Sequence, residues 1–171
     1  MTTWRFVLSA SAVALAAAAA IFAAQREAKR RHRSKGTRRV YKGQCHCGAV
    51  KFEALAPEHL VVWDCNCSIC AMLKNHHFII PEENFTLLQG EDSLSLYTFN
   101  TKTAKHLFCK HCGVSPFYRP RSNPDGYAIT LACVIPQEQL VSFEKRFFDG
   151  SNWEGFWGNS GIQSFSVKES T

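Results

Sequence analysis

Seven of the eight cysteines in this 171-residue chain fall into three short clusters, and this clustering constrains the fold more than any other feature. Thiols two or three residues apart can converge on one tetrahedral ion, but they are too close in sequence to pair comfortably as disulfides within a cluster. The spacing therefore predicts metal binding. The clusters have the patterns C-x-C, C-x-C-x-x-C and C-x-x-C, and they comprise Cys45 and Cys47, then Cys65, Cys67 and Cys70, then Cys109 and Cys112.

Seven thiolates divide into a closed set of four and an open set of three, the ligand numbers of structural and catalytic zinc sites. Gly48 and Gly113 directly follow the first and third clusters, and glycine favours the tight turns of metal-binding knuckles. The simplest partition therefore gives a structural zinc to Cys45, Cys47, Cys109 and Cys112, and a second, catalytic zinc to Cys65, Cys67 and Cys70. Spacing also permits a zinc-ribbon partition, in which the last two thiols of the second cluster join the third cluster.

Residues 6–24 form a run of nineteen residues without a charge. At about 1.5 Å per residue, such a helix can cross a hydrocarbon core about 30 Å thick. More positive charge follows the run than precedes it, which would place the C-terminal domain in the cytosol. We therefore predict a transmembrane anchor at residues 1–24, on a membrane such as the mitochondrial outer membrane or the endoplasmic reticulum. A cleaved targeting segment and an Ala-rich tail are the alternatives.

The positive charge of the chain is concentrated at its N-terminus. Residues 1–39 hold nine Lys and Arg and one acidic residue, whereas residues 40–171 hold eleven Lys and Arg and thirteen acidic residues. The net charge of +6 therefore belongs to the N-terminal arm, and no specific nucleic-acid binding is predicted for the remainder. We interpret residues 25–39 as a solvated basic linker.

From residue 40 onward, short apolar segments recur about every ten residues, for example at 60–63, 78–80 and 94–99. Turn-forming residues separate them, most plainly Ser-Asn-Pro-Asp-Gly at 122–126. This pattern predicts a mainly β domain of short antiparallel strands over residues 40–158. We expect the polar residues 159–171 to form a flexible tail.

A disulfide framework is the competing interpretation of the cysteines. It fits poorly, because the expected topology puts the thiols in a reducing compartment and three bridges would leave two cysteines over. The eighth cysteine, Cys133, lies in the apolar run 131–135, and we expect it to be a buried core thiol.

Several motifs resemble the glutathione-dependent formaldehyde-activating enzyme family, and most closely its centromere protein V branch. The resemblance extends from about residue 41 to residue 154. It implies a zinc-binding, mostly β fold of the Mss4-like type, and it supports the first partition of the thiols. The motifs are Gly-Gln-Cys-His-Cys-Gly-Ala-Val at 43–50, Asp-Cys-Asn-Cys-Ser-Ile-Cys at 64–70, His-Phe-Ile-Ile-Pro at 77–81, Tyr-Thr-Phe-Asn-Thr at 97–101, His-Leu-Phe-Cys-Lys-His-Cys-Gly-Val at 106–114 and Pro-Arg-Ser-Asn-Pro-Asp-Gly at 120–126.

Two departures separate this chain from that branch. The long disordered N-terminal region of centromere protein V is absent, and Ala132 stands where the branch tends to have His before the cysteine that matches Cys133. Centromeric and microtubule roles therefore do not transfer to this chain.

The resemblance implies a zinc-dependent carbon–sulfur lyase, similar to S-(hydroxymethyl)glutathione synthase, that joins glutathione and formaldehyde at Cys65, Cys67 and Cys70. Zinc on three thiolates has a net charge of about −1, so it is a weaker Lewis acid than zinc on three neutral histidines. Binding a substrate thiol as thiolate therefore suits this ligand set better than activating water.

The sequence does not single out a general base or an oligomeric state. Four histidines near the motifs could move protons, but each could equally pack in the core or bond the backbone. They are His46, His77, His106 and His111. Arg119 and Arg121 could receive a glutathione carboxylate, and Arg121 is our candidate, although an arginine beside a turn is usually solvated.

A second hypothesis belongs to a different functional class. The domain could be a non-catalytic, zinc-stabilised binding or scaffold module, because a fold and its motifs do not guarantee activity. Two zinc ions per chain, one of them easily removed, would favour the enzyme.

Overall fold

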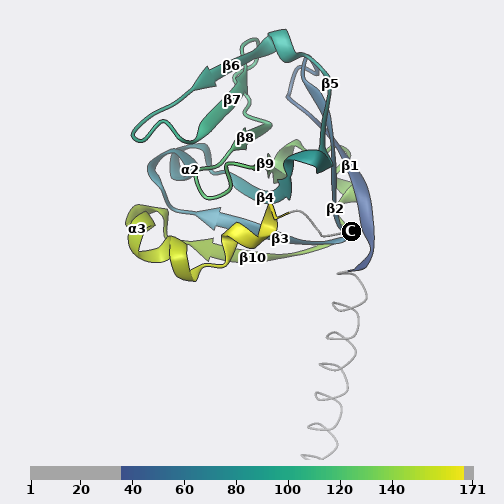
Figure 1. Ribbon diagram of the computed structural model, residues 1–171. Coiled ribbons are helices and arrows are strands. Elements are labelled where there is room, and N and C mark those ends of the chain that lie inside the picture. The colour runs from purple at the N-terminus through teal and green to yellow at the C-terminus, as the bar shows by residue number, and fades with distance from the viewer. Residues whose placement is uncertain (1–35, 168–171) are drawn as a thin grey trace, which may run out of the picture.

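The computed structural model describes residues 36–167, which form two β-sheets and several short helices (Figure 1). The strands are β1 (Arg38–Gln44), β2 (Lys51–Pro57), β3 (His59–Cys65), β4 (His76–Pro81), β5 (Phe85–Gln89), β6 (Leu94–Tyr97), β7 (Lys105–Cys109), β8 (Phe117–Arg119), β9 (Gly126–Thr130) and β10 (Ser142–Phe148). The α-helices are α2 (Ser68–Leu73) and α3 (Trp153–Phe156), and 3₁₀ turns lie at Glu82–Asn84, Glu91–Ser93, Leu131–Cys133, Gln137–Gln139, Gly150–Asn152, Trp157–Asn159 and Ile162–Phe165.

The two sheets have three and seven strands. The smaller has the order β1-β2-β5, and the larger has the order β10-β3-β4-β9-β8-β7-β6. The pairs are antiparallel except for β10, which runs parallel to β3 and places Phe148 opposite Cys65. The predicted mainly β fold is confirmed. The parallel pair was not predicted. Because β10 runs beside β3, the chain that follows β10 lies next to the second cysteine cluster.

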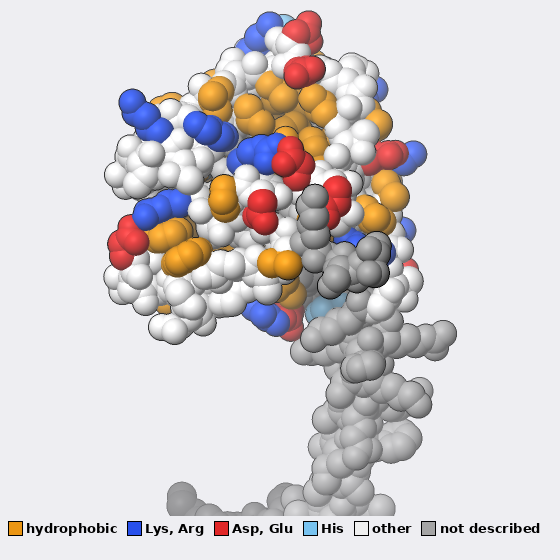
Figure 2. All heavy atoms as spheres, in the orientation of Figure 1, with side chains coloured by type: hydrophobic (Ala, Val, Ile, Leu, Met, Phe, Trp, Pro, Cys, Tyr) orange, Lys and Arg blue, Asp and Glu red, His pale blue; other side chains and the backbone are white. Residues whose placement is uncertain are grey.

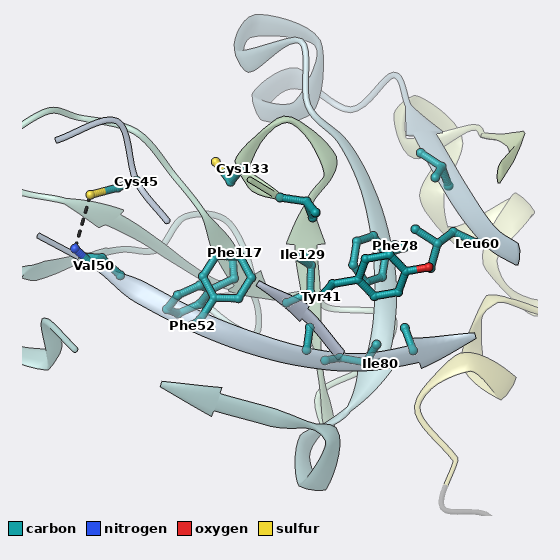
Figure 3. Packing of buried hydrophobic residues seen from close by; sticks show 14 of the residues in the cluster. Tyr41, Cys45, Val50, Phe52, Leu60, Phe78, Ile80, Phe117, Ile129 and Cys133 are labelled. Carbon is teal, nitrogen blue, oxygen red and sulfur yellow. Dashed lines mark hydrogen bonds between the residues drawn. The ribbon is translucent and has the colours of Figure 1, made fainter. Parts of the chain in front are cut away.

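The centre of the larger sheet is buried on both faces, and successive side chains of a strand point to opposite sides. In the central strand β4, Phe78 and Ile80 contribute to one hydrophobic cluster and Ile79 to another. The first core lies between the two sheets and includes Tyr41 and Phe52 (Figure 3). The second core lies on the opposite face and comprises Trp63, Ile79, Tyr118, Ala128, Phe148 and Ile162.

The C-terminal helical segment covers the second core. Trp153, Phe156, Trp157 and Phe165 pack against it, and Ile162 and Ser166 are buried. The side-chain amide of Asn123 donates to the Ile162 carbonyl at 3.0 Å and to the Ser166 hydroxyl at 2.8 Å. The described part of residues 159–171, for which a flexible tail was expected, is thus attached to the body of the domain.

The predicted transmembrane anchor requires correction. Within residues 36–167 no helix is long and apolar enough to cross a membrane, and the longest one, α2, has six residues. Residues 1–24, on which the prediction depended, lie outside the described residues. Their run is made largely of alanine, which is only weakly apolar, so its length without charge was a weak signal. The transmembrane element of the fold class and the membrane-anchored, cytosol-facing localisation are therefore withdrawn.

Basic and acidic side chains are mixed on the surface. On the face shown in Figure 2, Lys and Arg side chains lie among Asp and Glu side chains of the described residues. Some of these side chains form ion pairs: Arg119 contacts Glu82, and Arg146 contacts Glu144.

Candidate metal centres and the adjoining cavity

The first and third cysteine clusters meet in one group, which we call the four-thiol cluster: Cys45, Cys47, Cys109 and Cys112. Their sulfur atoms all lie within 4.8 Å of one another, with 3.6 Å between Cys45 and Cys47 and 3.7 Å between Cys47 and Cys109. Four sulfurs bound to one zinc at about 2.3 Å would be about 3.8 Å apart. The cluster therefore has the dimensions of a tetrahedral zinc site, and all eight cysteines of the chain are free thiols.

Two similar loops build the four-thiol cluster. The backbone N–H groups of Cys45 and Cys109 donate to the carbonyl of the valine five residues further on, at 3.0 and 2.9 Å. Gly48 and Gly113 complete the turns with φ angles of 75° and 74°, which disfavour other residues. The backbone N–H of Val50 also donates to the Cys45 sulfur at 3.3 Å (Figure 3), as expected for a sulfur that carries negative charge. Cys45 and Cys109 are fully buried in the first core.

The second cysteine cluster forms a separate group, which we call the three-thiol cluster: Cys65, Cys67 and Cys70. Cys65 ends β3, Cys67 immediately precedes α2, and Cys70 lies in the first turn of that helix, so their sulfurs converge within 4.8 Å. Hydrogen bonds from the Cys65 and Cys70 thiols hold the pKa of Cys67 far below its ordinary value. The hydrogen bond with Cys67 raises the pKa of Cys65 to about 11. A cation bound to all three sulfurs would replace the shared protons, so this donor set also fits zinc.

The loop of residues 149–151 fixes the three-thiol cluster from the C-terminal side. The side-chain amide of Asn66 donates to the Asp149 carboxylate at 3.0 Å and to the Ser151 hydroxyl at 3.3 Å. In return, the backbone N–H of Ser151 donates to the Asn66 side-chain oxygen at 3.0 Å. Since Asn66 lies between two of the thiols, these bonds orient the loop that carries them.

Gly150 packs directly on the sulfur atoms. A β-carbon added at this position would lie 2.5 Å from the Cys65 sulfur and 2.6 Å from the Cys67 β-carbon, closer than real contacts allow. Only glycine therefore fits between the 149–151 loop and the three-thiol cluster as the two are arranged.

A cavity of about 400 Å³ adjoins the three-thiol cluster. It is lined by Cys65, Cys67, Ser68, Ile69, Cys70, His77, Phe99, Asn100, Thr101, Ala104, His106, Tyr118, Pro120, Arg121, Ser122, Phe148, Gly150, Ser151, Trp153 and Ile162. None of the four-thiol cysteines is among these residues. The two clusters thus differ in surroundings as well as in ligand number, because the three-thiol cluster faces a space that could hold a small molecule.

A tyrosine and two histidines form another part of the cavity wall. The Tyr118 hydroxyl and His77 Nε2 are 3.1 Å apart, and the Tyr118 ring stacks on His106 with 5.0 Å between the ring centroids. Burial lowers the pKa of His77 to about 4 and also lowers that of His106, so both rings are neutral near pH 7. Burial, and then the three nearby sulfurs, raise the pKa of Tyr118 well above its ordinary value.

The two candidate arginines have different surroundings. Arg121 lines the cavity, stacks over the Trp153 ring at 3.6 Å and forms an ion pair with Glu154. Arg119 instead pairs with Glu82 and lies 4.3 Å from the centre of the Tyr127 ring, and it does not line the cavity.

The structure brings the predicted thiols together in the two groups of the simplest partition. The zinc-ribbon grouping is not formed, since Cys67 and Cys70 cluster with Cys65. Cys133 is buried in the first core as expected, and burial raises its pKa to about 12. His46 and His111 lie between cysteines of the four-thiol cluster and do not line the cavity.

Several residues around the three-thiol cluster were missed from the sequence, namely Asn66, Tyr118, Asp149, Gly150 and Trp153. Strand alternation could have placed Tyr118 on the face of Cys65 only if the pairing of β8 with β7 and β9 had been known. The 149–151 loop carried no signal, because its approach depends on the parallel pairing of β10 with β3.

These features define a thiol-rich β domain with one four-thiol candidate metal centre and one three-thiol candidate centre that faces a cavity. Residues 40–149 match the sequence model of the glutathione-dependent formaldehyde-activating enzyme family, and the chain belongs to this family. A crystal structure of a Rhodobacter sphaeroides protein is similar, with 30% sequence identity and a TM-score of 0.52, and the match covers 63% of this chain and 99% of that chain. Membership indicates a formaldehyde-activating or related function.

Proposed function

We propose that this chain is a zinc-dependent carbon–sulfur lyase that joins glutathione and formaldehyde into S-(hydroxymethyl)glutathione. The observation that carries the proposal is the three-thiol cluster, whose sulfurs lie within 4.8 Å of one another and face a cavity of about 400 Å³. A set of three protein ligands next to such a space is the arrangement of a catalytic zinc site with an exchangeable position. The family match supports glutathione and formaldehyde as the substrate class.

The proposal includes two zinc ions per chain. Cys65, Cys67 and Cys70 would hold the catalytic ion, and the four-thiol cluster would hold the structural ion. When bound to three thiolates, zinc supplies a soft, weakly Lewis-acidic centre that keeps a substrate sulfur deprotonated near neutral pH. The metal-binding residues belong to a domain that we place at residues 40–158.

The remaining residues of the cavity would bind and orient the thiol. Phe99 and Trp153 offer apolar surface that excludes water from the reacting sulfur. Arg121 would attract a carboxylate of glutathione, in exchange for its exposed pair with Glu154. We assign the chain to the centromere protein V branch of the family on the motifs at 64–70 and 106–114, without a centromeric role.

Metal content and ligand response together test this proposal. We expect two zinc ions per chain, one of which is removed by a mild chelator. In the cobalt-substituted protein, glutathione should change the sulfur-to-cobalt charge-transfer band, and the protein should accelerate adduct formation from glutathione and formaldehyde. A protein with two equally tight ions, no spectral response and no acceleration would instead be a zinc-stabilised scaffold.

A further inference from the structure

Tyr118 and His77 form a buried polar pair beside the three-thiol cluster, and the thiols alone give this pair no role. Tyr118 is 6% exposed and His77 is 3% exposed, and their hydroxyl oxygen and Nε2 atoms are 3.1 Å apart. A buried polar atom without a hydrogen-bond partner is costly, and His77 Nδ1 has none among the described residues, so this pair in the cavity wall calls for an explanation.

The second nitrogen of His77 decides which group donates. His77 Nδ1 is buried and has no hydrogen-bond partner among the described residues. A buried N–H without a partner is rarer than a buried acceptor without one, so the proton of the neutral ring belongs on Nε2. His77 therefore donates to the Tyr118 oxygen, and the hydroxyl hydrogen of Tyr118 is free to bond another acceptor.

Tyr118 lies in the cavity wall, so its hydroxyl hydrogen can reach an acceptor in the cavity. Tyr118 lines the same cavity as the three thiols, and the nearby sulfurs contribute to raising the pKa of its hydroxyl. His106 stacks on the Tyr118 ring at an interplanar angle of 16°, and the backbone of Tyr118 pairs with that of Ala128 on β9. The ring is thus held with its hydroxyl beside the place where a substrate sulfur would react.

We infer that Tyr118 is a catalytic residue that donates its hydroxyl hydrogen bond to the carbonyl oxygen of the aldehyde, with His77 as its positioning residue. The inference rests on the proposed function. As the substrate sulfur attacks, the carbon–sulfur bond forms and the carbonyl π pair moves onto oxygen, where Tyr118 stabilises the developing charge. The proton lost by the thiol ends on the new hydroxyl group, so the thiol and the aldehyde are the only reactants.

Tyr118→Phe tests this role, because it removes the hydroxyl and keeps the ring that stacks on His106. We expect the variant to retain both metal ions and the glutathione-dependent change in the cobalt spectrum. The kcat for adduct formation should fall about 100-fold, with little change in KM for glutathione. Tyr127→Phe is the matched control, since its hydroxyl accepts from Arg119 outside the cavity, and it should keep the wild-type kcat.

A double variant tests the dependence of His77 on Tyr118. His77→Phe should lower kcat, and His77→Phe combined with Tyr118→Phe should be no slower than Tyr118→Phe alone, because His77 acts through the hydroxyl. Wild-type kcat in Tyr118→Phe overturns the inference but leaves the proposed function intact. Loss of the catalytic metal in Tyr118→Phe also overturns it, since the hydroxyl would then support Cys70. A wild-type protein with neither a glutathione response nor acceleration overturns the function and the inference together.

Discussion

The four-thiol and three-thiol clusters use the same ligand chemistry on opposite faces of one sheet. Cys45 and Cys109 are buried in the first core, between the two sheets. Cys65 packs against the second core, on the face that the C-terminal segment covers and where the cavity lies. The difference between the clusters is therefore one of position. A cluster with two of its thiols buried between two sheets can connect them, whereas thiols beside a cavity can receive a ligand.

The two clusters are also supported differently. The four-thiol cluster depends on two loops that each close with their own backbone hydrogen bonds and that also bond to the neighbouring Gln89 and Ser93. The three-thiol cluster depends on the 149–151 loop, which is more than 80 residues away in sequence from Asn66. We expect substitutions at the first cluster to affect folding, and substitutions at the second to affect metal affinity and substrate binding.

The largest effect is expected for Cys109→Ser. A structural zinc on four thiolates contributes on the order of 10 kcal/mol of apparent folding free energy, comparable to the whole stability of a domain. The variant should be unfolded or insoluble, as measured by circular dichroism and thermal melting. Cys133→Ala is the control, because Cys133 is buried in the same core and belongs to neither cluster. It should keep both ions and lose about 1–2 kcal/mol. Soluble Cys109→Ser with a wild-type melting temperature would contradict the structural role.

Cys67→Ser should have a large effect that is confined to the second cluster. The four-thiol cluster and both hydrophobic cores remain, so the domain should stay folded and its zinc content should fall from two ions to one. The cobalt-substituted variant should no longer respond to glutathione. If Cys67→Ser lost both ions or unfolded, the two clusters would not be independent.

Gly150→Ala should weaken the three-thiol centre without removing a ligand. The added methyl group would meet the Cys65 sulfur at 2.5 Å, so the loop or the sulfur must move. Displaced support around a metal site typically costs 10- to 100-fold in affinity, which competition with a chromophoric chelator can measure. Gly158→Ala is the matched control, since a β-carbon there meets nothing within 4 Å. Equal affinities in the two variants would show that the close contact at Gly150 is unimportant.

The sequence was sufficient to predict what depends on local spacing. Cys45 and Cys47 are two residues apart beside a glycine, as the pattern of a metal-binding knuckle requires. Their grouping with the third cluster was the simplest partition by ligand number, whereas spacing alone left the zinc-ribbon partition open. Short apolar segments separated by turn-forming residues likewise predicted the strands, because this pattern can be identified without knowledge of the strand partners.

What could not be predicted depends on contacts between distant segments. The cavity wall at Tyr118 requires the pairing of β8 with both β7 and β9, and the approach of Gly150 requires the parallel pairing of β10 with β3. Composition was also misleading at the N-terminus, where the uncharged run at 6–24 suggested a membrane span. At Tyr118 and Gly150 the deciding quantity was the tertiary arrangement, which no local pattern contains.

The smallest effect is expected at the rim of the cavity and compares Arg121 with Arg119. Hydrogen bonds to a charged partner contribute about 1.5–3 kcal/mol when buried, but Arg121 is partly exposed and must leave Glu154 to bind a carboxylate. Arg121→Gln should therefore raise KM for glutathione only about 3- to 10-fold, with kcat unchanged, and more at low ionic strength than at high. Arg119→Gln removes the same charge outside the cavity, and its kinetics should match the wild type. If both variants raised KM equally, the effect would come from the overall charge of the protein, and Arg121 would have no specific contact with the substrate.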